Sequence, residues 1–399
     1  MTGLSEFLSA LTAVAIMTAG TPASAGGPVA CPVGETGPAQ PSSLARPILP
    51  EVHCSSFVLD NGGATVFGSN YDDSYWDEGL VLVNKRGVVK TSLLAGTTGA
   101  HARWVSRYAS VTFNLVGFGY AWAWMNERGL AISTMSLRVT RHPDADARPP
   151  LDSGEWMQFL LDTCATIEEV IATDAAVRIL TVDHYLVADA HGNAAAVEFL
   201  SGRMVVHTGT DMPAQVLTNS TYESSLGTWL EYRRASNTNY WGLDRSLHRF
   251  CLAADRADAF EPCDDATAVA YAFETLQRIA GERFGGGTSQ WSIVFDTPNA
   301  RVAFRTVRHP EIRFVDLARF DPWCTGPVQM LDIHAGPEGD VTDYFSDYSH
   351  DANLDHMRDF LRAWGIPFTE QGLLWTVQYL EGFPCQRYRP PRRSLGRSP

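Results

Sequence analysis

Cys54 stands where one residue could supply both a nucleophile and a base. It opens a strand-like run, Cys-Ser-Ser-Phe-Val-Leu, directly after a segment rich in Gly, Pro, Ser and Ala. Cleavage of the peptide bond before Cys54 would leave a thiol and a free α-amine together. An unperturbed α-amine has a pKa of about 7.7, so part of it is neutral at physiological pH and can accept the thiol proton. The alternative is that Cys54 is a disulfide cysteine, the ordinary role of cysteine in an exported protein.

The other cysteines indicate export rather than metal binding. The chain has 7 cysteines, with no Cys-x-x-Cys pair and no His-x-x-x-His pair. A structural zinc site therefore has no support, and we expect no metal and no cofactor. If Cys31 leaves with a pro-segment and Cys54 stays a free thiol, an odd number remains, so at least one further thiol is unpaired or linked outside the chain. The pairing among these remaining cysteines stays open: Cys164, Cys251, Cys263, Cys324 and Cys385.

The segment before Cys54 predicts targeting and processing. An apolar run over 8–17 is followed by small residues that end in Ala-Ser-Ala at 23–25, an A-x-A cleavage signal. We therefore expect residues 1–25 to be a signal peptide and the protein to be secreted or periplasmic, although 1–6 lack the usual Lys or Arg. Residues 26–53 have the composition of a linker or pro-segment, and we expect their removal on maturation.

Hairpins interleaved with single helices follow Cys54. A hairpin turned at 60–63, a meander over 184–207 and a second hairpin over 291–307 are predicted from alternating apolar residues and turn residues. Apolar residues recur at helical spacing over 155–172 and 266–280. This order indicates antiparallel sheets covered by helices, an α+β fold, rather than a parallel βαβ sheet.

The end of the chain is predicted to be an extension of this domain. We expect residues 329–386 to be a helical C-terminal extension, with helices over 353–363 and 370–379. Residues 387–399 combine arginines with prolines and are expected to be a disordered, solvated tail.

Several function classes are disfavoured. The net charge of −14 argues against a general nucleic-acid binder, and the apolar run near the N-terminus is too short to span a bilayer. No Gly-x-Ser-x-Gly elbow and no phosphate-binding loop is present, and the Gly-rich stretch over 117–122 has Trp where a dinucleotide fingerprint needs its third Gly. The acidic run over 340–355 lacks the spacing of a calcium loop.

Six short motifs follow one another between Cys54 and about Phe320. They are Cys54-Ser-Ser-Phe, Val66-Phe-Gly-Ser-Asn-Tyr-Asp72, Met125-Asn-Glu-Arg-Gly-Leu130, Val216-Leu-Thr-Asn219, Ser246-Leu-His-Arg249-Phe250, and the closing hairpin of Gln290-Trp-Ser-Ile-Val-Phe-Asp296, Phe304-Arg-Thr306 and Ile312-Arg-Phe-Val-Asp316. Each alone is weak, but their order resembles the choloylglycine hydrolase and penicillin V acylase family of linear amide C–N hydrolases. This resemblance implies a four-layer αββα N-terminal-nucleophile fold over 54–328.

The resemblance also implies four catalytic residues. Cys54 would be the nucleophile and Asp72 the carboxylate that positions its amine and thiol. Asn219 would donate its amide to the oxyanion, because a tetrahedral intermediate needs donors aimed where charge develops. Arg249 would support the thiolate and Asp72, since a buried carboxylate needs a cation to stay ionised. The alternatives are a turn-capping Asp72, a loop-capping Asn219 and a surface-paired Arg249.

Three positions depart from the family pattern. Ser69 stands where relatives carry Arg or Lys, so a cation that would lower the thiol pKa is missing. Ser136 stands where some relatives supply a second oxyanion Asn, which leaves a hydroxyl or backbone donor there. Trp124 replaces a small residue. We expect a substrate pocket that includes Ser69, Trp76, Trp124 and Met135. The aromatic residues that would favour an apolar acyl group are Tyr75, Trp76, Tyr120, Trp122 and Trp124.

The expected partner is a small-molecule N-acyl amide, and homo-oligomerisation is left open. The resemblance implies aryl-acetyl or phenoxyacetyl amides, fatty N-acyl amides including acyl-homoserine lactones, or conjugated bile acids, of which we favour an aryl or fatty acyl amide. Two alternatives keep the fold. An acyltransferase would pass the acyl group from Cys54 to an amine, and a catalytically silent binding protein would have lost the reaction together with the cation at position 69.

Overall fold

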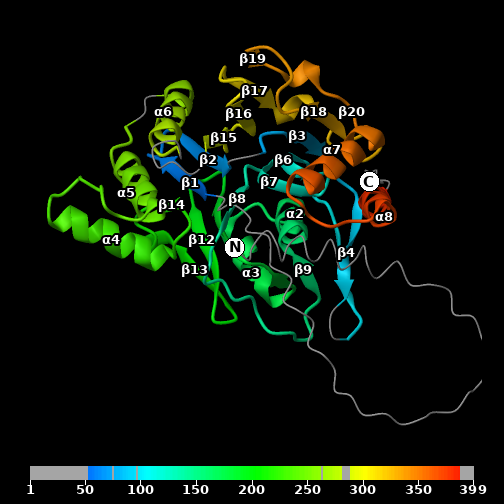
Figure 1. Cartoon of the computed structure of the whole chain (residues 1–399), viewed down its shortest axis with the longest axis horizontal. Coiled ribbons are helices and arrows are strands. Elements are labelled where there is room, and N and C mark those ends of the chain that lie inside the picture. The colour runs from blue at the N-terminus through cyan, green and yellow to red at the C-terminus, as the bar shows by residue number, and fades with distance from the viewer. Residues whose placement is uncertain (1–52, 74–75, 96–97, 262–263, 281–287, 387–399) are drawn as a thin grey trace, which may run out of the picture.

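Two large β-sheets, stacked face to face, form the centre of the molecule (Figure 1). This computed structural model describes residues 53–73, 76–95, 98–261, 264–280 and 288–386. The first sheet runs through β14 (Val216–Leu217), β1 (His53–Asp60), β2 (Thr65–Asp73), β15 (Thr288–Asp296), β16 (Arg301–Thr306), β17 (Arg313–Asp316) and β19 (Gly339–Asp340). Its neighbouring strands are antiparallel except β17 and β19.

The second sheet is entirely antiparallel. It runs through β13 (Arg203–Thr208), β12 (Ala194–Leu200), β11 (Asp183–Ala188), β8 (Ala131–Ser136), β7 (Tyr120–Asn126), β6 (Ser110–Gly117), β3 (Leu80–Asn84), β18 (Gln329–Asp332) and β20 (Ser346–Asp347). Two small sheets pair β4 (Val89–Ala95) with β5 (His101–Val105), and β9 (Pro150–Asp152) with β10 (Arg178–Leu180).

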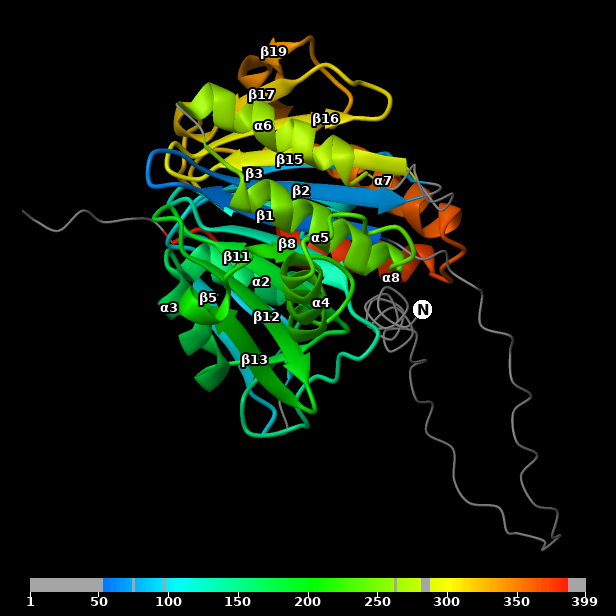
Figure 2. The same ribbon diagram turned by 90° about the vertical axis from the view of Figure 1, so that its left-hand side faces the viewer.

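Helices cover the outer face of each sheet (Figures 1 and 2). The first sheet is covered by α5 (Arg245–Asp258), which packs on β1, and α6 (Asp265–Arg278), which packs on β2 and β15, while α4 (Tyr222–Arg234) packs on α5. The second sheet is covered by α2 (Ser153–Thr163), which packs on β7, and is followed by α3 (Ile167–Ala172). The predicted four-layer αββα arrangement is confirmed.

The β1–β2 hairpin is buried on both faces, because one face meets the second sheet and the other meets α5 and α6. Every residue of β2 is buried. Gly68 lies opposite Phe57 in the hairpin, and a Cβ there would come within 2.5 Å of the Phe57 ring. The motif glycine therefore makes room for an aromatic core residue rather than for a ligand.

The predicted hairpins and meander are present as β1–β2, β11–β13 and β15–β16. The single helix predicted over 155–172 is divided, because Cys164 adopts an extended conformation and Thr166 caps a new helix by accepting from the backbone N of Glu169. At the other end of α2, Asp152 and Glu155 form a capping box, so the helix begins before the predicted boundary.

Residues 329–386 contribute to the sheets as well as forming helices. The predicted helices correspond to α7 (His350–Ala363) and α8 (Glu370–Glu381), while β18 and β20 extend the second sheet beyond β3. Phe360 of α7 meets Trp76 edge to face with ring centroids 5.5 Å apart. The segment is thus packed into the main core and is more than a helical extension.

Some expectations fall on parts of the chain without a described structure. The signal peptide, the pro-segment up to residue 52, Tyr75, Cys263 and the tail over 387–399 lie outside the described residues. Within the described part, no helix combines the length and apolar character needed to cross a bilayer.

A disulfide joins Cys324 to Cys385, while Cys54, Cys164 and Cys251 are buried free thiols. The bond closes a loop with a sequence separation of 61 residues and ties the segment after α8 to the loop before β18. Cross-linking such a loop restricts the unfolded chain and stabilises the folded state.

We predict that replacing Cys324 and Cys385 by Ser lowers the free energy of unfolding by about 2–5 kcal/mol. Urea unfolding followed by tryptophan fluorescence would measure the change. A reducing agent should destabilise the wild-type protein similarly and leave the double variant unaffected. Equal stability of oxidised wild type and double variant would contradict the prediction.

Candidate active site

Cys54 lies near the start of β1 and is completely buried. Across the hairpin it pairs with Tyr71, and the ring of Tyr71 packs against Trp122 of the second sheet at a centroid distance of 5.1 Å. Because side chains alternate along a strand, Cys54 faces the second sheet while Ser55 faces α5. The thiol therefore lies between the two sheets.

Asn219, which follows β14, contacts the backbone of Cys54. Its Oδ1 accepts a hydrogen bond from Cys54 N at 3.0 Å, and its Nδ2 donates to the Ser136 carbonyl at 3.0 Å. One of the two amide hydrogens on Nδ2 remains for another acceptor. Asn219 therefore has a structural role, as the loop-capping alternative supposes. Its amide joins its own loop after β14 to Cys54 and to Ser136.

Arg249 on α5 holds the other side of Cys54. Its Nη1 donates to the Cys54 carbonyl and to Ser55 Oγ, both at 2.5 Å, and its Nη2 donates to Asn219 Oδ1 at 2.8 Å. The side chain is only 1% exposed, so it is not a surface cation. Burial lowers the pKa of Arg249, and the charges of Asp72 and Cys54 raise it.

Ser246 explains the spacing of the Ser-x-x-Arg motif. It lies three residues before Arg249 on the same face of α5. Its Oγ accepts a hydrogen bond from the Asn219 backbone N at 2.9 Å and lies 3.0 Å from Thr218 Oγ1. One helical turn therefore holds both the backbone and the side chain of Asn219. No role was predicted for Ser246, although its place in the Ser-x-x-Arg motif was the available signal.

Asp72, on β2, lies one residue beyond the partner of Cys54 in the hairpin. Its Oδ1 accepts from Ser289 Oγ at 2.5 Å, while its Oδ2 is buried and has no hydrogen-bond partner among the described residues. No ion pair joins Asp72 to Arg249 in the described part of the chain, so Arg249 acts on it through its charge at longer range. Burial raises the pKa of Asp72 to about 6, against the opposing effects of Arg249 and Ser289.

The thiol of Cys54 is held in its neutral form in this uncleaved chain. Burial raises its pKa well above the usual value, and the negative charge of Asp72 adds to that effect. A hydrogen bond from the Asp72 backbone and the charge of Arg249 act in the opposite direction but are outweighed.

Ser69 occupies the position where the resemblance implies a cation. Its Oγ lies 2.8 Å from Ser133 Oγ on β8 and accepts a hydrogen bond from Ser56 Oγ at 3.1 Å. Ser69 is only 1% exposed. The hydroxyls of Ser56, Ser69 and Ser133 form a buried chain of contacts that joins the two sheets next to Cys54. Arg249 is then the cation whose charge lowers the pKa of the Cys54 thiol.

Ser136 does not aim its hydroxyl as an oxyanion donor would. It lies opposite Asp183 in the β8–β11 pair, and its hydroxyl favours the charged form of the Asp183 carboxylate. Its carbonyl is what meets Asn219. Both Ser136 and Asp183 line a pocket together with Trp122, Met157 and Ser153. Asp183 was not predicted as a site residue.

Trp124 does not line this pocket, which corrects the expectation for that residue. Alternation alone would put Trp122 and Trp124 on one face, but the β6–β7 pairing shifts register at Trp122. A bulge adds one residue and reverses the faces beyond it. Trp124 therefore packs in the core cluster that contains Trp156 and Leu160 of α2, while Trp122 stays on the side of Cys54.

The two remaining expected pocket residues are core residues. Trp76 packs against α7 through His356 and Phe360. Met135 is completely buried in the same cluster as Cys54. Neither is among the residues that line the pocket beside Ser136.

The Met-Asn-Glu motif has a structural role. Asn126 Nδ2 donates to the carbonyls of Leu161 and Cys164 at the end of α2, at 2.9 and 2.8 Å. Gly129 has a φ of +78° and a Cβ there would lie 2.1 Å from the Thr297 carbonyl oxygen. The motif therefore fixes how the sheet meets α2 and the β15–β16 turn.

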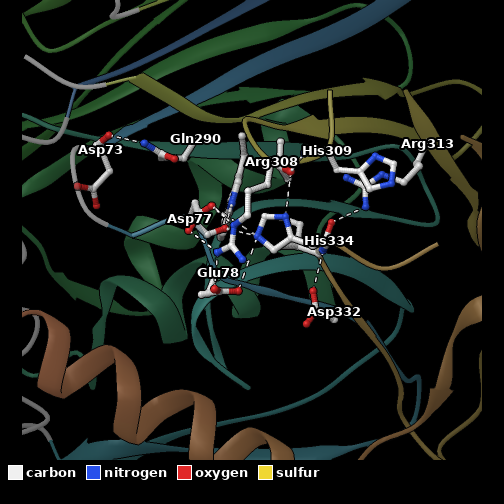
Figure 3. A network of polar contacts seen from close by, with 12 residues as sticks. Asp73, Asp77, Glu78, Gln290, Arg308, His309, Arg313, Asp332 and His334 are labelled. Atoms are coloured by element: carbon white, nitrogen blue, oxygen red, sulfur yellow. Dashed lines mark hydrogen bonds and ion pairs between the residues drawn. The ribbon is translucent and has the colours of Figure 1, made fainter. Parts of the chain in front are cut away.

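A network of charged residues holds the chain that follows Asp72 (Figure 3). Gln290 Nε2 donates to the Asp73 carbonyl at 2.7 Å, and Arg308 Nε donates to Asp77 Oδ2 at 2.5 Å. Arg308 also pairs with Glu78, so its guanidinium supplies the positive charge between the two carboxylates. The network anchors the segment after Asp72 to β15 and to the loop after β16.

We predict that Asp72→Asn stabilises the uncleaved chain at pH 7. A carboxyl with a pKa of about 4 when unfolded and about 6 when folded binds its proton more tightly in the folded state. Its contribution to the free energy of unfolding therefore falls as pH rises from 4 to 6, by about 3 kcal/mol. The asparagine keeps an acceptor for Ser289 without this loss.

Urea unfolding between pH 4 and 8, with Cys54→Ala in both proteins to keep the chain intact, would test this. The variant should gain stability relative to its parent as pH rises from 4 to 6, and the exposed Asp211→Asn serves as the control for loss of one charge. Parallel curves for parent and Asp72→Asn would contradict the prediction.

Comparison with known proteins agrees with this geometry. Residues 54–260 match the model of the linear amide C–N hydrolases, choloylglycine hydrolase family. The chain is 24% identical over 279 residues to penicillin V acylase from Pectobacterium atrosepticum, covering 57% of this chain and 71% of that protein.

Solved structures show the same fold. Penicillin V acylase from Agrobacterium tumefaciens superposes with a TM-score of 0.66 at 24% identity, over 74% of this chain and 98% of that one. A variant of conjugated bile acid hydrolase from Clostridium perfringens gives a TM-score of 0.58 at 16% identity, over 71% and 98%. With the family match covering more than half of its length, the chain belongs to the choloylglycine hydrolase family of linear amide C–N hydrolases.

Proposed function

We propose that this protein is an exported hydrolase that cleaves the C–N bond of a linear N-acyl amide with Cys54 as an N-terminal nucleophile. Residues 1–25 would direct export to the periplasm or the medium, and residues up to 53 would be removed on maturation. The family match begins at Cys54, which supports this boundary.

One observation carries the proposal: the backbone of Cys54 is held by side chains that are distant in sequence. Its N donates to Asn219 Oδ1 and its carbonyl accepts from Arg249 Nη1. A disulfide cysteine needs no such contacts, whereas a residue whose own amine acts as the base needs that nitrogen fixed beside its thiol.

In the mature protein the neutral α-amine takes the proton of the Cys54 thiol, and the thiolate attacks the substrate carbonyl carbon. The carbonyl oxygen gains negative charge and is stabilised by the free amide hydrogen of Asn219. The C–N bond then breaks, and the proton passes from the ammonium to the leaving amine. Water, deprotonated by the same α-amine, attacks the thioester and releases the carboxylic acid.

The uncleaved chain is suited to remain inactive. Its Cys54 nitrogen is an amide and cannot serve as a base, and the pKa of its thiol is raised by burial. Cleavage would create an α-amine whose protonated fraction would offset the negative charge of Asp72, which raises the pKa of the Cys54 thiol. Attack of Cys54 on the preceding carbonyl, followed by hydrolysis of the resulting thioester, would make this cleavage autocatalytic.

The substrate class follows from the pocket beside Ser136. Its walls include Leu115, Val116 and Trp122, which suit an apolar aryl or alkyl group. The penicillin V acylases and the bile acid hydrolase with this fold support an acyl amide rather than a peptide. A panel of phenylacetyl, phenoxyacetyl and fatty acyl amides, with conjugated bile salts, covers the candidates.

We predict that Cys54→Ala abolishes both maturation and amide hydrolysis. Mass spectrometry and N-terminal sequencing should find Cys54 as the first residue of the wild-type protein and an upstream start in the variant. Cys251→Ala removes another buried free cysteine and is the matched control, which should mature normally. An active Cys54→Ala protein, or a fully active wild type that keeps residues 26–53, would refute the mechanism.

We also predict that Asn219→Ala lowers kcat by about 100- to 1,000-fold, because it removes an oxyanion donor. Steady-state kinetics on a matured sample would measure this loss, with KM changed far less. Asn237→Ala, at an exposed position after α4, is the control. A kcat within threefold of wild type would exclude Asn219 from the oxyanion site.

A further inference from the structure

The pocket beside Ser136 contains a carboxylate that the mechanism does not use. Asp183, the first residue of β11, lines the pocket with the apolar residues Leu115, Trp122 and Met157. The pocket is open to solvent at its mouth, so a carboxylate on its wall can contact a ligand.

This pocket lies next to the nucleophile on two sides. Trp122 packs on Tyr71, the direct strand partner of Cys54. Ser136 accepts through its carbonyl from Asn219, whose Oδ1 in turn accepts from Cys54 N. A group that fills the pocket would therefore belong to a substrate whose amide reaches Cys54.

Asp183 has no ion-pair partner among the described residues. Ser153 Oγ donates to its Oδ2 at 3.5 Å, a long contact, and the Ser136 and Thr134 hydroxyls also favour the charged form. The basic group whose charge bears on Asp183 is the adjacent His184, and that ring is engaged by Glu198 at 3.1 Å and by the Thr218 carbonyl at 2.5 Å. Asp183 therefore lacks a cation of its own.

Such a carboxylate is costly to keep in a pocket wall whose other groups near it are neutral hydroxyls and apolar side chains. Burial raises the pKa of Asp183 to about 6, so the group is still mainly ionised at pH 7. A positive charge brought by a ligand would offset this desolvation, and a charge-assisted hydrogen bond to a carboxylate is stronger than a neutral one. A purely apolar ligand would cover the charge and leave it uncompensated.

The indole of Trp122 adds a second polar group to the wall. Its Nε1 is buried and without a hydrogen-bond partner among the described residues. This donor can pair only with an acceptor on a ligand, whereas the face of the same indole ring can attract a cation.

We propose that Asp183 selects N-acyl amides whose pocket-bound group is an aryl or alkyl chain ending in a protonated amine. This rests on the proposed hydrolysis at Cys54 for the reaction, and on the pocket alone for the selectivity. Asp183 would be a specificity-determining residue that pairs with the ammonium while the chain packs on Leu115 and Met157.

Binding tests the selectivity without catalysis. Isothermal titration of the full-length protein with benzylammonium and with benzyl alcohol compares a cation with a neutral hydrogen-bond donor of similar size. We expect benzylammonium to bind at least tenfold more tightly, Asp183→Asn to abolish this difference, and the exposed Asp211→Asn to preserve it. Equal Kd values for the two ligands with wild type would overturn the proposal, even if the variant failed to fold.

Hydrolysis tests the selectivity in turnover. Two pairs of chromogenic amides are compared, one pair with an aminomethyl or a methyl group on the acyl half and the other pair with the same groups on the amine half. In one pair the ammonium member should have at least a tenfold higher kcat/KM, and Asp183→Asn should bring the ratio to about one. Hydrolysis without preference in either pair would overturn the selectivity. Absence of any hydrolysis would refute the proposed function, and the binding comparison would still decide the role of Asp183.

Discussion

The site depends on one oxygen atom, Asn219 Oδ1, which accepts from both Cys54 N and Arg249 Nη2. These donors come from the first strand and from a helix almost 200 residues later, so the oxygen joins β1, β14 and α5. Loss of this acceptor would leave two buried donors unsatisfied, one of them charged. The positions of Cys54, of its backbone nitrogen and of the Asn219 amide therefore depend on one set of hydrogen bonds.

The region around this oxygen contains fewer positively charged than negatively charged side chains. Arg249 is the cation that reaches Cys54, whereas the carboxylate of Asp72 faces the same region and Asp183 lies on the adjacent pocket wall. Ser69, bonded to other hydroxyls, adds no charge. Both carboxyls have a raised pKa because burial disfavours their ionised forms. A new α-ammonium on Cys54 would compensate the charge of Asp72, and a cationic substrate would compensate the charge of Asp183.

Strands and helices that are marked by a short repeat of apolar residues were predicted well. Alternating apolar residues between turn residues located the β1–β2 and β15–β16 hairpins and the β11–β13 meander, because a strand bounded by a turn is a local property. The helical spacing over 155–172 was found too, but its interruption at Cys164 was not, since an extended residue followed by a capping Thr166 leaves the apolar pattern intact. The expectation that Trp124 lines a substrate pocket did not anticipate the bulge at Trp122, which turns Trp124 into the core below α2 and depends on the pairing with the neighbouring strand.

By itself the sequence identified the family and the αββα class, because ordered motifs survive where overall identity is low, and it predicted the set of Cys54, Asp72, Asn219 and Arg249. Only the tertiary structure decided which of these side chains touch. It showed Ser246 holding Asn219, Arg249 bonding to the Cys54 carbonyl rather than to Asp72, and Asp183 on the pocket wall. These contacts join segments far apart in the chain, and their distances follow from how two sheets and a helix pack, which no local pattern encodes.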